Sequence, residues 1–246
     1  TQTRADEQHM SERRWCAIVV AAGRGQRFGR PKQLVELAGK PMVAWSLETF
    51  GTIVGVSNLV IATESEYINV MQQLASTYAP HVTCAVVPGG ETRQASVRAA
   101  LAQVPERCEG VFVHDGARPL VRALDVRAGM RAIRPGVGAL LAAPVVDTIK
   151  VVAPGSARVT QTLDRSTLWA AQTPQFAMTR DLRAAHAQAV RDGADVTDDA
   201  ALLERSGIEV VIVPSSEENF KVTHAFDRDR AEVLLRDRVV TQRSSA

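Results

Sequence analysis

Residues 15–32 read Trp-Cys-Ala-Ile-Val-Val-Ala-Ala-Gly-Arg-Gly-Gln-Arg-Phe-Gly-Arg-Pro-Lys, an apolar run that passes directly into a loop of glycines and cations. The apolar run predicts a buried strand. Gly23 and Gly25 lack the Cβ atoms that would keep a polyanion off the backbone, whose N–H groups can form an anion-binding nest. Four cations lie within reach of one phosphate chain: Arg24, Arg27, Arg30 and Lys32. The stretch therefore predicts a loop that binds a nucleoside triphosphate, and the alternative is a surface turn after an edge strand.

The rest of the chain alternates between strand-like and helix-like segments. Apolar runs typical of buried strands occupy residues 16–21, 58–63, 82–87, 110–114, 137–143 and 209–213. Helical patterns occupy residues 42–50, 66–78, 92–104, 124–134, 180–191, 198–205 and 225–238. This alternation predicts an α/β fold around a mainly parallel sheet, in a single domain over residues 14–238. Residues 1–13 and 239–246 are expected to be flexible extensions.

One segment breaks the alternation. Residues 147–152 and 158–163 are rich in Thr and Val and flank the sequence Ala153-Pro-Gly-Ser-Ala157. Two alternating strands around a Pro-Gly turn predict a β-hairpin. It would stand in an arm of about residues 143–170. The hairpin is either a decoration of the sheet or an arm that reaches a partner subunit, and the residues alone leave both open.

Composition excludes several classes of protein. The 246 residues carry 29 basic and 27 acidic side chains and only 4% aromatic residues, so binding of nucleic acid through bulk charge or base stacking is not expected. The three cysteines are far apart, which is neither a disulfide framework nor a metal motif. No apolar run approaches the length of a membrane span. We therefore expect a cytoplasmic protein that acts on small molecules.

The loop after the third predicted strand is a second candidate for the site, because open parallel sheets bind ligands beyond the carboxyl ends of their strands. It reads Pro88-Gly-Gly-Glu-Thr-Arg93. Gly90 permits close approach of a ligand to the backbone, and Glu91 and Ser96 can bind the hydroxyl or amino groups of a nucleoside. A helix-capping turn would explain the same residues equally well.

The sequence His114-Asp-Gly-Ala-Arg-Pro119 follows the next predicted strand. A carboxylate at the end of a buried strand, such as that of Asp115, is costly unless it is paired or bound to a metal. Beside a triphosphate loop, a Mg²⁺ ligand is the natural role, since Mg²⁺ prefers one or two carboxylates together with phosphate oxygens. An ion pair with Arg118 is the structural alternative.

The chemistry available to these residues is limited. The chain has neither a Gly-x-Ser-x-Gly nucleophile motif nor a zinc-type histidine cluster. Transfer of a phosphoryl or nucleotidyl group needs mainly positioning and neutralisation of charge, which arginines, lysines and one metal-binding carboxylate can supply. Polar residues elsewhere stand out only weakly by themselves, and surface or capping roles are the default for Arg165, Thr173, Thr197 and Lys221.

Taken together, these motifs carry a resemblance to a known family. Residues 21–32 resemble the signature loop of nucleotidyltransferases with a Rossmann-like fold, and Val113-His-Asp-Gly-Ala-Arg-Pro119 is similar to the signature of the 2-C-methyl-D-erythritol 4-phosphate cytidylyltransferases of the non-mevalonate isoprenoid pathway. The resemblance covers residues 14–238 in order. It continues through residues 143–150, 163–165, 168–169, 173–175, 197–198 and 221–223.

The resemblance implies a reaction and a set of site residues. CTP and methylerythritol phosphate would give the CDP-alcohol and pyrophosphate, with Mg²⁺ held by Asp115. Arg27 and Lys32 would stabilise the transition state, while Arg165 and Lys221 would aim the substrate phosphate. The implied CTP-binding residues are Ala21, Ala22, Gly23, Gly25, Gly90, Glu91, Ser96 and Gly116. The implied residues around methylerythritol phosphate are Arg118, Thr148, Arg165, Thr173, Thr197 and Lys221.

The family also implies a homodimer in which the hairpin is the dimer arm, so that Thr148 and Arg165 would serve the neighbouring site. Two positions depart from the family pattern: Gln26 stands where a basic residue is common, and Glu91 where aspartate is common. The alternatives are a ribitol 5-phosphate cytidylyltransferase and a nucleotide-binding regulator without catalysis. A bifunctional enzyme that also carries the next, cyclising step is not expected from a chain of this length.

Overall fold

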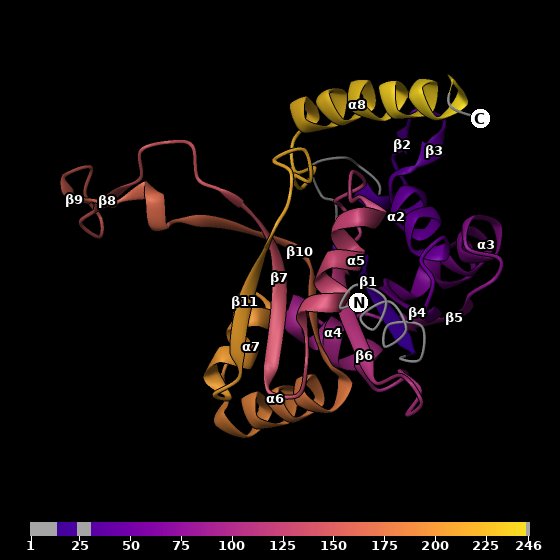
Figure 1. The fold of residues 1–246 in the computed structure, drawn as a ribbon, viewed down its shortest axis with the longest axis horizontal. Helices are drawn as coiled ribbons and strands as arrows, with labels where there is room; N and C mark the ends of the chain where they lie inside the picture. Colours follow the sequence, from indigo (N-terminus) through magenta and orange to yellow (C-terminus); the bar gives the residue numbers. More distant parts are fainter. Residues whose placement is uncertain (1–13, 24–30, 245–246) are drawn as a thin grey trace, which may run out of the picture.

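The computed structural model describes residues 14–23 and 31–244, so expectations for residues 1–13 and for the loop 24–30 lie outside the described residues. Within the described ranges, one seven-stranded sheet forms the centre of the molecule. Its strands are β1 (Trp15–Val20), β4 (Val56–Thr63), β5 (Thr83–Pro88), β6 (Gly110–Asp115), β7 (Val137–Pro144), β10 (Trp169–Met178) and β11 (Glu209–Pro214). They lie in the order β11-β7-β10-β6-β1-β4-β5, which confirms the expected α/β fold (Figure 1).

Neighbouring strands are parallel except at β10, which runs antiparallel to both β6 and β7. The sequence reading did not identify β10 as a strand, because Gln172, Thr173 and Gln175 interrupt its apolar pattern. These polar side chains are nevertheless buried. They bond within the protein: the amide of Gln175, for example, donates to Asp198 Oδ2 at 2.9 Å. Hydrogen bonds thus replace apolar contacts at the centre of this strand.

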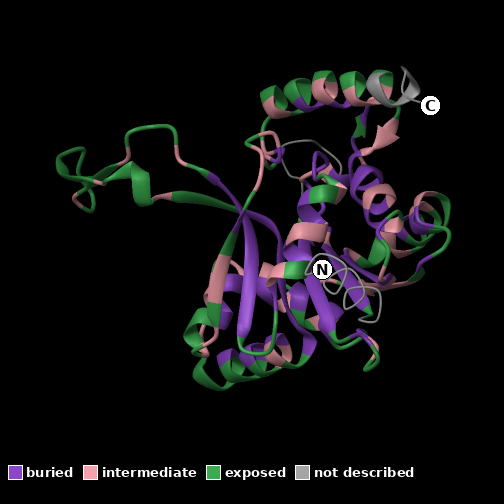
Figure 2. Cartoon of the chain, in the orientation of Figure 1, coloured by how far each residue is buried: buried purple, intermediate pink, exposed green. Residues whose placement is uncertain are grey.

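Helices cover both faces of the sheet and define two cores. On one face lie α2 (Met42–Gly51), α3 (Ile68–Tyr78) and α5 (Ala123–Ala132). On the other lie α4 (Arg93–Leu101), α6 (Thr179–Asp192) and α7 (Asp199–Arg205). Successive residues of β1 alternate between the cores: Ala17 packs into the first and Ile18 into the second. Figure 2 shows the resulting buried sheet between partly exposed helices.

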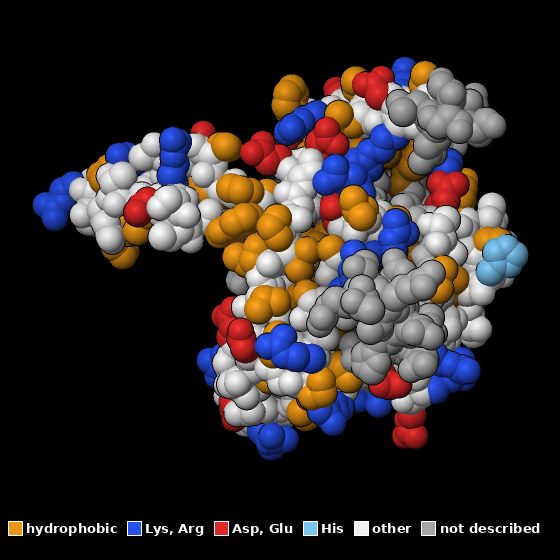
Figure 3. Space-filling model, viewed as in Figure 1, with side chains coloured by type: hydrophobic (Ala, Val, Ile, Leu, Met, Phe, Trp, Pro, Cys, Tyr) orange, Lys and Arg blue, Asp and Glu red, His pale blue; other side chains and the backbone are white. Residues whose placement is uncertain are grey.

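The predicted hairpin is present and projects from the sheet (Figure 1). Strands β8 (Lys150–Val152) and β9 (Val159–Thr162) pair antiparallel, and all of their residues are exposed. A short 3-10 helix, η3 (Arg165–Thr167), lies on the return to β10. Hydrophobic side chains gather where this arm joins the body (Figure 3). Exposed hydrophobic residues of the arm are Val146, Val151, Val152, Val159 and Trp169.

A third, smaller cluster holds the last helix, α8 (Ala225–Ser244). Ala231 and Leu235 of α8 pack there with Leu37 of β2 (Glu36–Leu37), which pairs with β3 (Lys40–Pro41). The expected end of this helix at Arg238 is wrong: it continues to Ser244, because residues 239–244 contain neither Gly nor Pro. Among the described residues, no helix is long and apolar enough to cross a membrane.

Candidate active site

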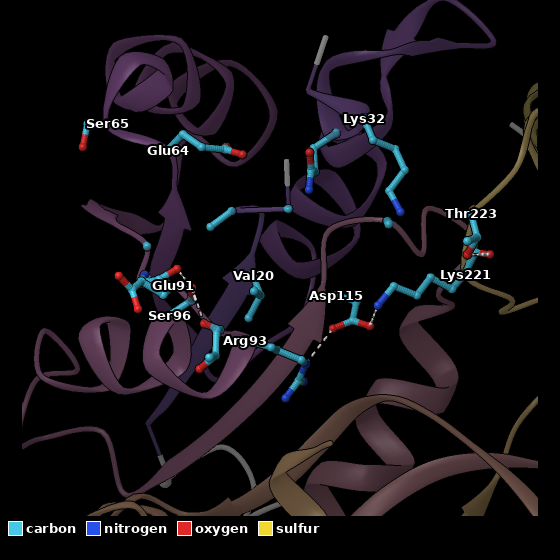
Figure 4. A pocket seen from close by; sticks show the side chains of 17 residues that line it. Val20, Lys32, Glu64, Ser65, Glu91, Arg93, Ser96, Asp115, Lys221 and Thr223 are labelled. Carbon is cyan, nitrogen blue, oxygen red and sulfur yellow. Dashed lines mark hydrogen bonds and ion pairs between the residues drawn. The ribbon is translucent and has the colours of Figure 1, made fainter. Parts of the chain in front are cut away.

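The segments that follow four parallel strands border one cavity of about 1090 Å³. These segments follow β1, β4, β5 and β6, so the cavity lies beyond the carboxyl ends of the strands, as expected. Lys32 begins the 3-10 helix η1 (Lys32–Leu34) and lies on the same side of the cavity as Lys221, which comes from the segment before α8 (Figure 4). The cavity brings together eight of the predicted site residues: Ala22, Gly23, Lys32, Gly90, Glu91, Ser96, Asp115 and Lys221.

The loop after β5 borders the cavity and caps α4, so the capping turn is confirmed and the nucleoside-binding role stays a prediction. Thr92 Oγ1 accepts from the N–H of Ala95 at 3.0 Å, which satisfies a helix terminus. The hydroxyl of Ser96 accepts from the N–H of Gly90 at 3.0 Å and orders the turn. Side chains at Gly89 and Gly90 would collide with Ala22 and Ala95. Only glycine therefore fits where this loop packs against the end of β1.

Asp115 lies at the end of β6 between two cations (Figure 4). Its Oδ1 accepts from Arg93 Nε at 3.1 Å and its Oδ2 from Lys221 Nζ at 2.8 Å. Arg118 Nε, the partner expected from sequence, is more distant at 3.9 Å. Burial would raise the pKa of this carboxyl, but Arg93, Lys221 and Arg118 outweigh burial and hold the pKa well below its usual range. Asp115 is thus a carboxylate at any physiological pH.

Arg93 is the main residue that the sequence reading missed. Its Nη1 donates to Asp199 Oδ2 at 2.8 Å while its Nε donates to Asp115, so one guanidinium bridges two carboxylates. Asp199 is the first residue of α7 and is buried. Arg93 closes the Gly-Gly-Glu-Thr-Arg loop, which was the available signal, but no local pattern points to a partner as remote in sequence as Asp199.

A buried hydrogen-bond chain fixes the backbone of Asp115. Its N–H donates to Thr173 Oγ1 at 3.0 Å, and that hydroxyl lies 3.1 Å from His114 Nδ1. His114 Nε2 lies 3.1 Å from the carbonyl oxygen of Arg118, which can only accept. The proton of the neutral ring is therefore on Nε2, and Nδ1 accepts from Thr173. Burial lowers the pKa of His114 to about 3, which keeps the ring neutral.

Several predicted residues do not border the cavity. Ala21 and Gly116 use their N–H groups on backbone carbonyls of Ala62 and Val20. Thr173 is buried, and Arg118 is held by the carbonyl of Asn219 at 2.7 Å. Thr148, Arg165 and Thr197 are exposed elsewhere, with Arg165 bonded to the carbonyl of Val146 in the arm. Gly25 and Arg27 lie outside the described residues.

Other residues missed by the sequence reading complete the walls. Beside Arg93, the polar ones are Gln33, Glu64, Ser65, Thr92 and Thr223. Glu64 and Ser65 follow β4, so the rule that ligands bind at carboxyl ends of strands was the signal that could have found them. Gln33 lies in η1 and Thr223 in the segment before α8, and neither directly follows a strand of the sheet. The walls carry the cations Lys32, Arg93 and Lys221, which can bind a phosphate chain, and three carboxylates, those of Glu64, Glu91 and Asp115, which can bind a cation.

Comparison with known proteins agrees with this geometry. A family model described as 2-C-methyl-D-erythritol 4-phosphate cytidylyltransferase (IspD) matches residues 15–237. Curated relatives with that name include one from Parasynechococcus marenigrum, 42% identical over 89% of this chain and 96% of its own. Another, from Streptomyces coelicolor, is 41% identical over 92% of this chain and 86% of its own.

Solved structures extend the likeness to three dimensions. The Francisella tularensis 2-C-methyl-D-erythritol 4-phosphate cytidylyltransferase is 32% identical, with a TM-score of 0.74 over 89% of this chain and 98% of its own. A 4-diphosphocytidyl-2C-methyl-D-erythritol synthase from Anaerococcus prevotii shares the fold, with a TM-score of 0.82 at 23% identity over 92% of this chain and 99% of its own. The chain therefore belongs to the 2-C-methyl-D-erythritol 4-phosphate cytidylyltransferase family.

Proposed function

We propose that this chain transfers the cytidylyl group of CTP to 2-C-methyl-D-erythritol 4-phosphate, giving 4-diphosphocytidyl-2-C-methyl-D-erythritol and pyrophosphate. The observation that carries the proposal is the convergence of Lys32, Asp115 and Lys221 on one cavity beside the glycine loops, in a chain of this family. In the reaction, a phosphate oxygen of the acceptor attacks the α-phosphorus of CTP in line, and pyrophosphate leaves.

The residues divide between the two substrates. The backbone of Ala22, Gly23 and Gly90, with Glu91 beside it, would hold the nucleotide. Lys32, together with Arg27, would stabilise the negative charge that grows on the α-phosphate. Lys221 and Arg165 would aim the acceptor phosphate. No covalent enzyme intermediate is needed, since positioning and charge carry the step.

The donor set fits Mg²⁺ only in part. Among the described residues, no group of three or more His, Cys, Asp or Glu side chains could hold a metal ion. One protein carboxylate is enough to bind Mg²⁺ when phosphate oxygens supply further ligands. Asp115, ionised in the cavity wall, would therefore hold Mg²⁺ together with the CTP phosphates. There the ion would neutralise phosphate charge.

The arm supports a homodimer. Its strands β8 and β9 bury none of their residues within the chain, although Val151, Val152 and Val159 are apolar. An isolated two-stranded hairpin is marginal in water and gains stability by packing on another surface. We propose that the arm packs on a second copy of the chain and that Thr148 and Arg165 act in the site of that copy.

We also propose a cytoplasmic location. All three cysteines are free thiols, and Cys16 and Cys108 are buried, as suits a reducing compartment. Fractionation of the source cells with an antibody to the chain tests this, since recovery outside the cytoplasmic fraction would contradict it.

Pyrophosphate release tests the function directly. CTP should be turned over with methylerythritol phosphate, and ribitol 5-phosphate should be a much poorer acceptor. Equal or better turnover of ribitol 5-phosphate would favour that alternative acceptor. CTP binding without release of pyrophosphate from any polyol phosphate would favour the nucleotide-binding regulator.

A further inference from the structure

We infer that Arg93, anchored by the buried Asp199, is a positioning residue that fixes the carboxylate of Asp115 for the reaction. The inference rests on the proposed function for its effect on turnover. Neither Arg93 nor Asp199 is among the site residues predicted from the sequence. The bridge that they form reaches from the second core of the sheet into the cavity.

The geometry gives the two carboxylates different roles. The carboxylate of Asp115 lines the cavity, whereas the side chain of Asp199 is only 3% exposed and does not border it. A planar guanidinium that donates to both groups has a fixed orientation. Asp199 is held in turn by its buried place in the first turn of α7. Asp199 therefore holds Arg93, and Arg93 holds Oδ1 of Asp115 while Lys221 contacts Oδ2.

Charge explains why a second carboxylate is useful. Arg93 alone would neutralise Asp115 and compete for the phosphates of a nucleotide, because it borders the same cavity. With Asp199 included, the three groups carry a net charge of about −1 at neutral pH. Asp199 thus offsets the charge of Arg93 and leaves the charge of Asp115 to Lys221, Arg118 and a metal ion. The bond to Asp199 would also keep Arg93 on the carboxylates instead of on the phosphates of a nucleotide.

The alternative explanation is that the bridge between Arg93 and Asp199 only stabilises the fold. A buried Arg–Asp pair could serve folding alone, and its rupture would leave an unpaired buried charge. Removing both partners avoids that penalty, since neither charge then stays behind. The variant Asp199→Asn frees the arginine, whereas the double variant R93Q/D199N removes the bridge and leaves the net charge of the cavity region unchanged. Comparison of the two variants thereby separates the effect of the bridge on protein stability from its effect on the position of Asp115.

The experiment measures three quantities for each protein: the Kd for CTP without acceptor, kcat for pyrophosphate release, and the melting temperature. In Asp199→Asn, CTP should bind more tightly than in wild type, because Arg93 becomes available to the phosphates, while kcat falls. In R93Q/D199N, the melting temperature and the Kd for CTP should return toward wild-type values and kcat should stay low. Loss of a residue that orients a metal-binding carboxylate typically costs about 10- to 100-fold in activity.

A matched control is Asp125→Asn, which removes another buried aspartate that pairs with an arginine, Arg122, at the start of a helix. It should lower the melting temperature and leave the Kd for CTP unchanged. Recovery of kcat together with melting temperature in R93Q/D199N would overturn the inference and make the bridge structural. An unchanged Kd for CTP in Asp199→Asn would likewise overturn the anchoring of Arg93.

Two further comparisons distinguish failure of the inference from failure of folding or of the proposed function. If the double variant does not fold, Arg93→Lys replaces it, because an ammonium keeps the charge but lacks the rigid fork that spans both carboxylates. Wild-type kcat in Arg93→Lys would contradict the positioning role. If the wild-type protein itself fails to release pyrophosphate with methylerythritol phosphate, the proposed function fails, and the CTP affinities of the variants still decide the role of Asp199.

Discussion

Lys221 Nζ lies 2.8 Å from Oδ2 of Asp115, although 106 residues separate the two in the chain. The lysine side chain is 44% exposed and the aspartate only 10%, so the lysine is the partner that can move. An arriving phosphate can draw Lys221 toward itself while the carboxylate stays in place. The pair therefore joins a buried anion to a more exposed cation in the wall of the cavity.

The variant Asp115→Asn tests the fixed half of this pair. It keeps the shape of the side chain but removes the charge that three cations surround. We expect kcat to fall on the order of a hundredfold and half-saturation to need more Mg²⁺. Pyrophosphate release over a Mg²⁺ titration measures both. A near-normal rate with unchanged Mg²⁺ dependence would reduce Asp115 to a structural partner of its cations.

Lys32→Ala should lower kcat more than it weakens CTP binding if, as proposed, the ammonium meets charge that grows during transfer. Loss of one such donor typically costs on the order of a hundredfold in rate. Lys40→Ala is the matched control, since Lys40 pairs with Glu48 and does not border the cavity. A raised KM with kcat retained in Lys32→Ala would mean that the lysine only binds the ground state.

Thr173→Val separates two roles for this threonine. The hydroxyl accepts the N–H of Asp115 and lies against His114, so its loss should cost about 1–3 kcal/mol of stability and lower kcat. Thr173→Ser should restore both. Contact with methylerythritol phosphate, which the family resemblance implied, would show instead as a raised KM for that substrate with unchanged melting temperature.

The parallel strands could be predicted from the sequence more fully than the antiparallel strand β10. Strands such as β1 and β4 lie between two cores, so their continuous apolar runs identified them closely. The antiparallel strand β10 contains buried glutamines, so its sequence resembles that of a loop. The cavity loops after β1, β5 and β6 were found because each follows a parallel strand, whereas Glu64 and Ser65 after β4 were missed. The Arg93–Asp199 bridge was missed because only the packing of α7 against the sheet brings its partners together.

Subunit exchange tests the dimer. Equal amounts of Lys32→Ala and Arg165→Ala protein, each nearly inactive, are mixed and allowed to exchange. If Arg165 serves the partner's site, one site of each mixed dimer receives both defects and the other receives neither. Random pairing then leaves about a quarter of all sites intact, and activity should rise toward that fraction of wild type. Demonstrated exchange without recovery would place Arg165 in the site of its own chain.

Acid should destabilise the fold through His114. Burial, aided by Arg118 and opposed by Asp115, lowers the pKa of His114 to about 3. The unfolded chain takes up this proton near pH 6.5, so between about pH 6.5 and 3 the unfolded state binds more protons. The free energy of unfolding should therefore fall with falling pH, by up to about 1.4 kcal/mol per pH unit from this group.

Denaturant titrations between pH 7 and pH 5 measure this slope. The variant His114→Asn should be less stable at pH 7 and should show a flatter dependence on pH than wild type. The same slope in both proteins would assign the acid sensitivity to other groups.

The place of β10 in the sheet sets an order of events during translation. β6 is synthesised long before β10, which carries Thr173 and must pair with the open edge of β6, and Lys221 leaves the ribosome later still. Until then the nascent amino-terminal half exposes a hydrophobic strand edge, the kind of surface that chaperones shield from aggregation. It also carries Asp115 without Lys221 and without Asp199. A truncated chain that ends before β10 should therefore hold the glycine loops of the enzyme and none of its catalytic competence.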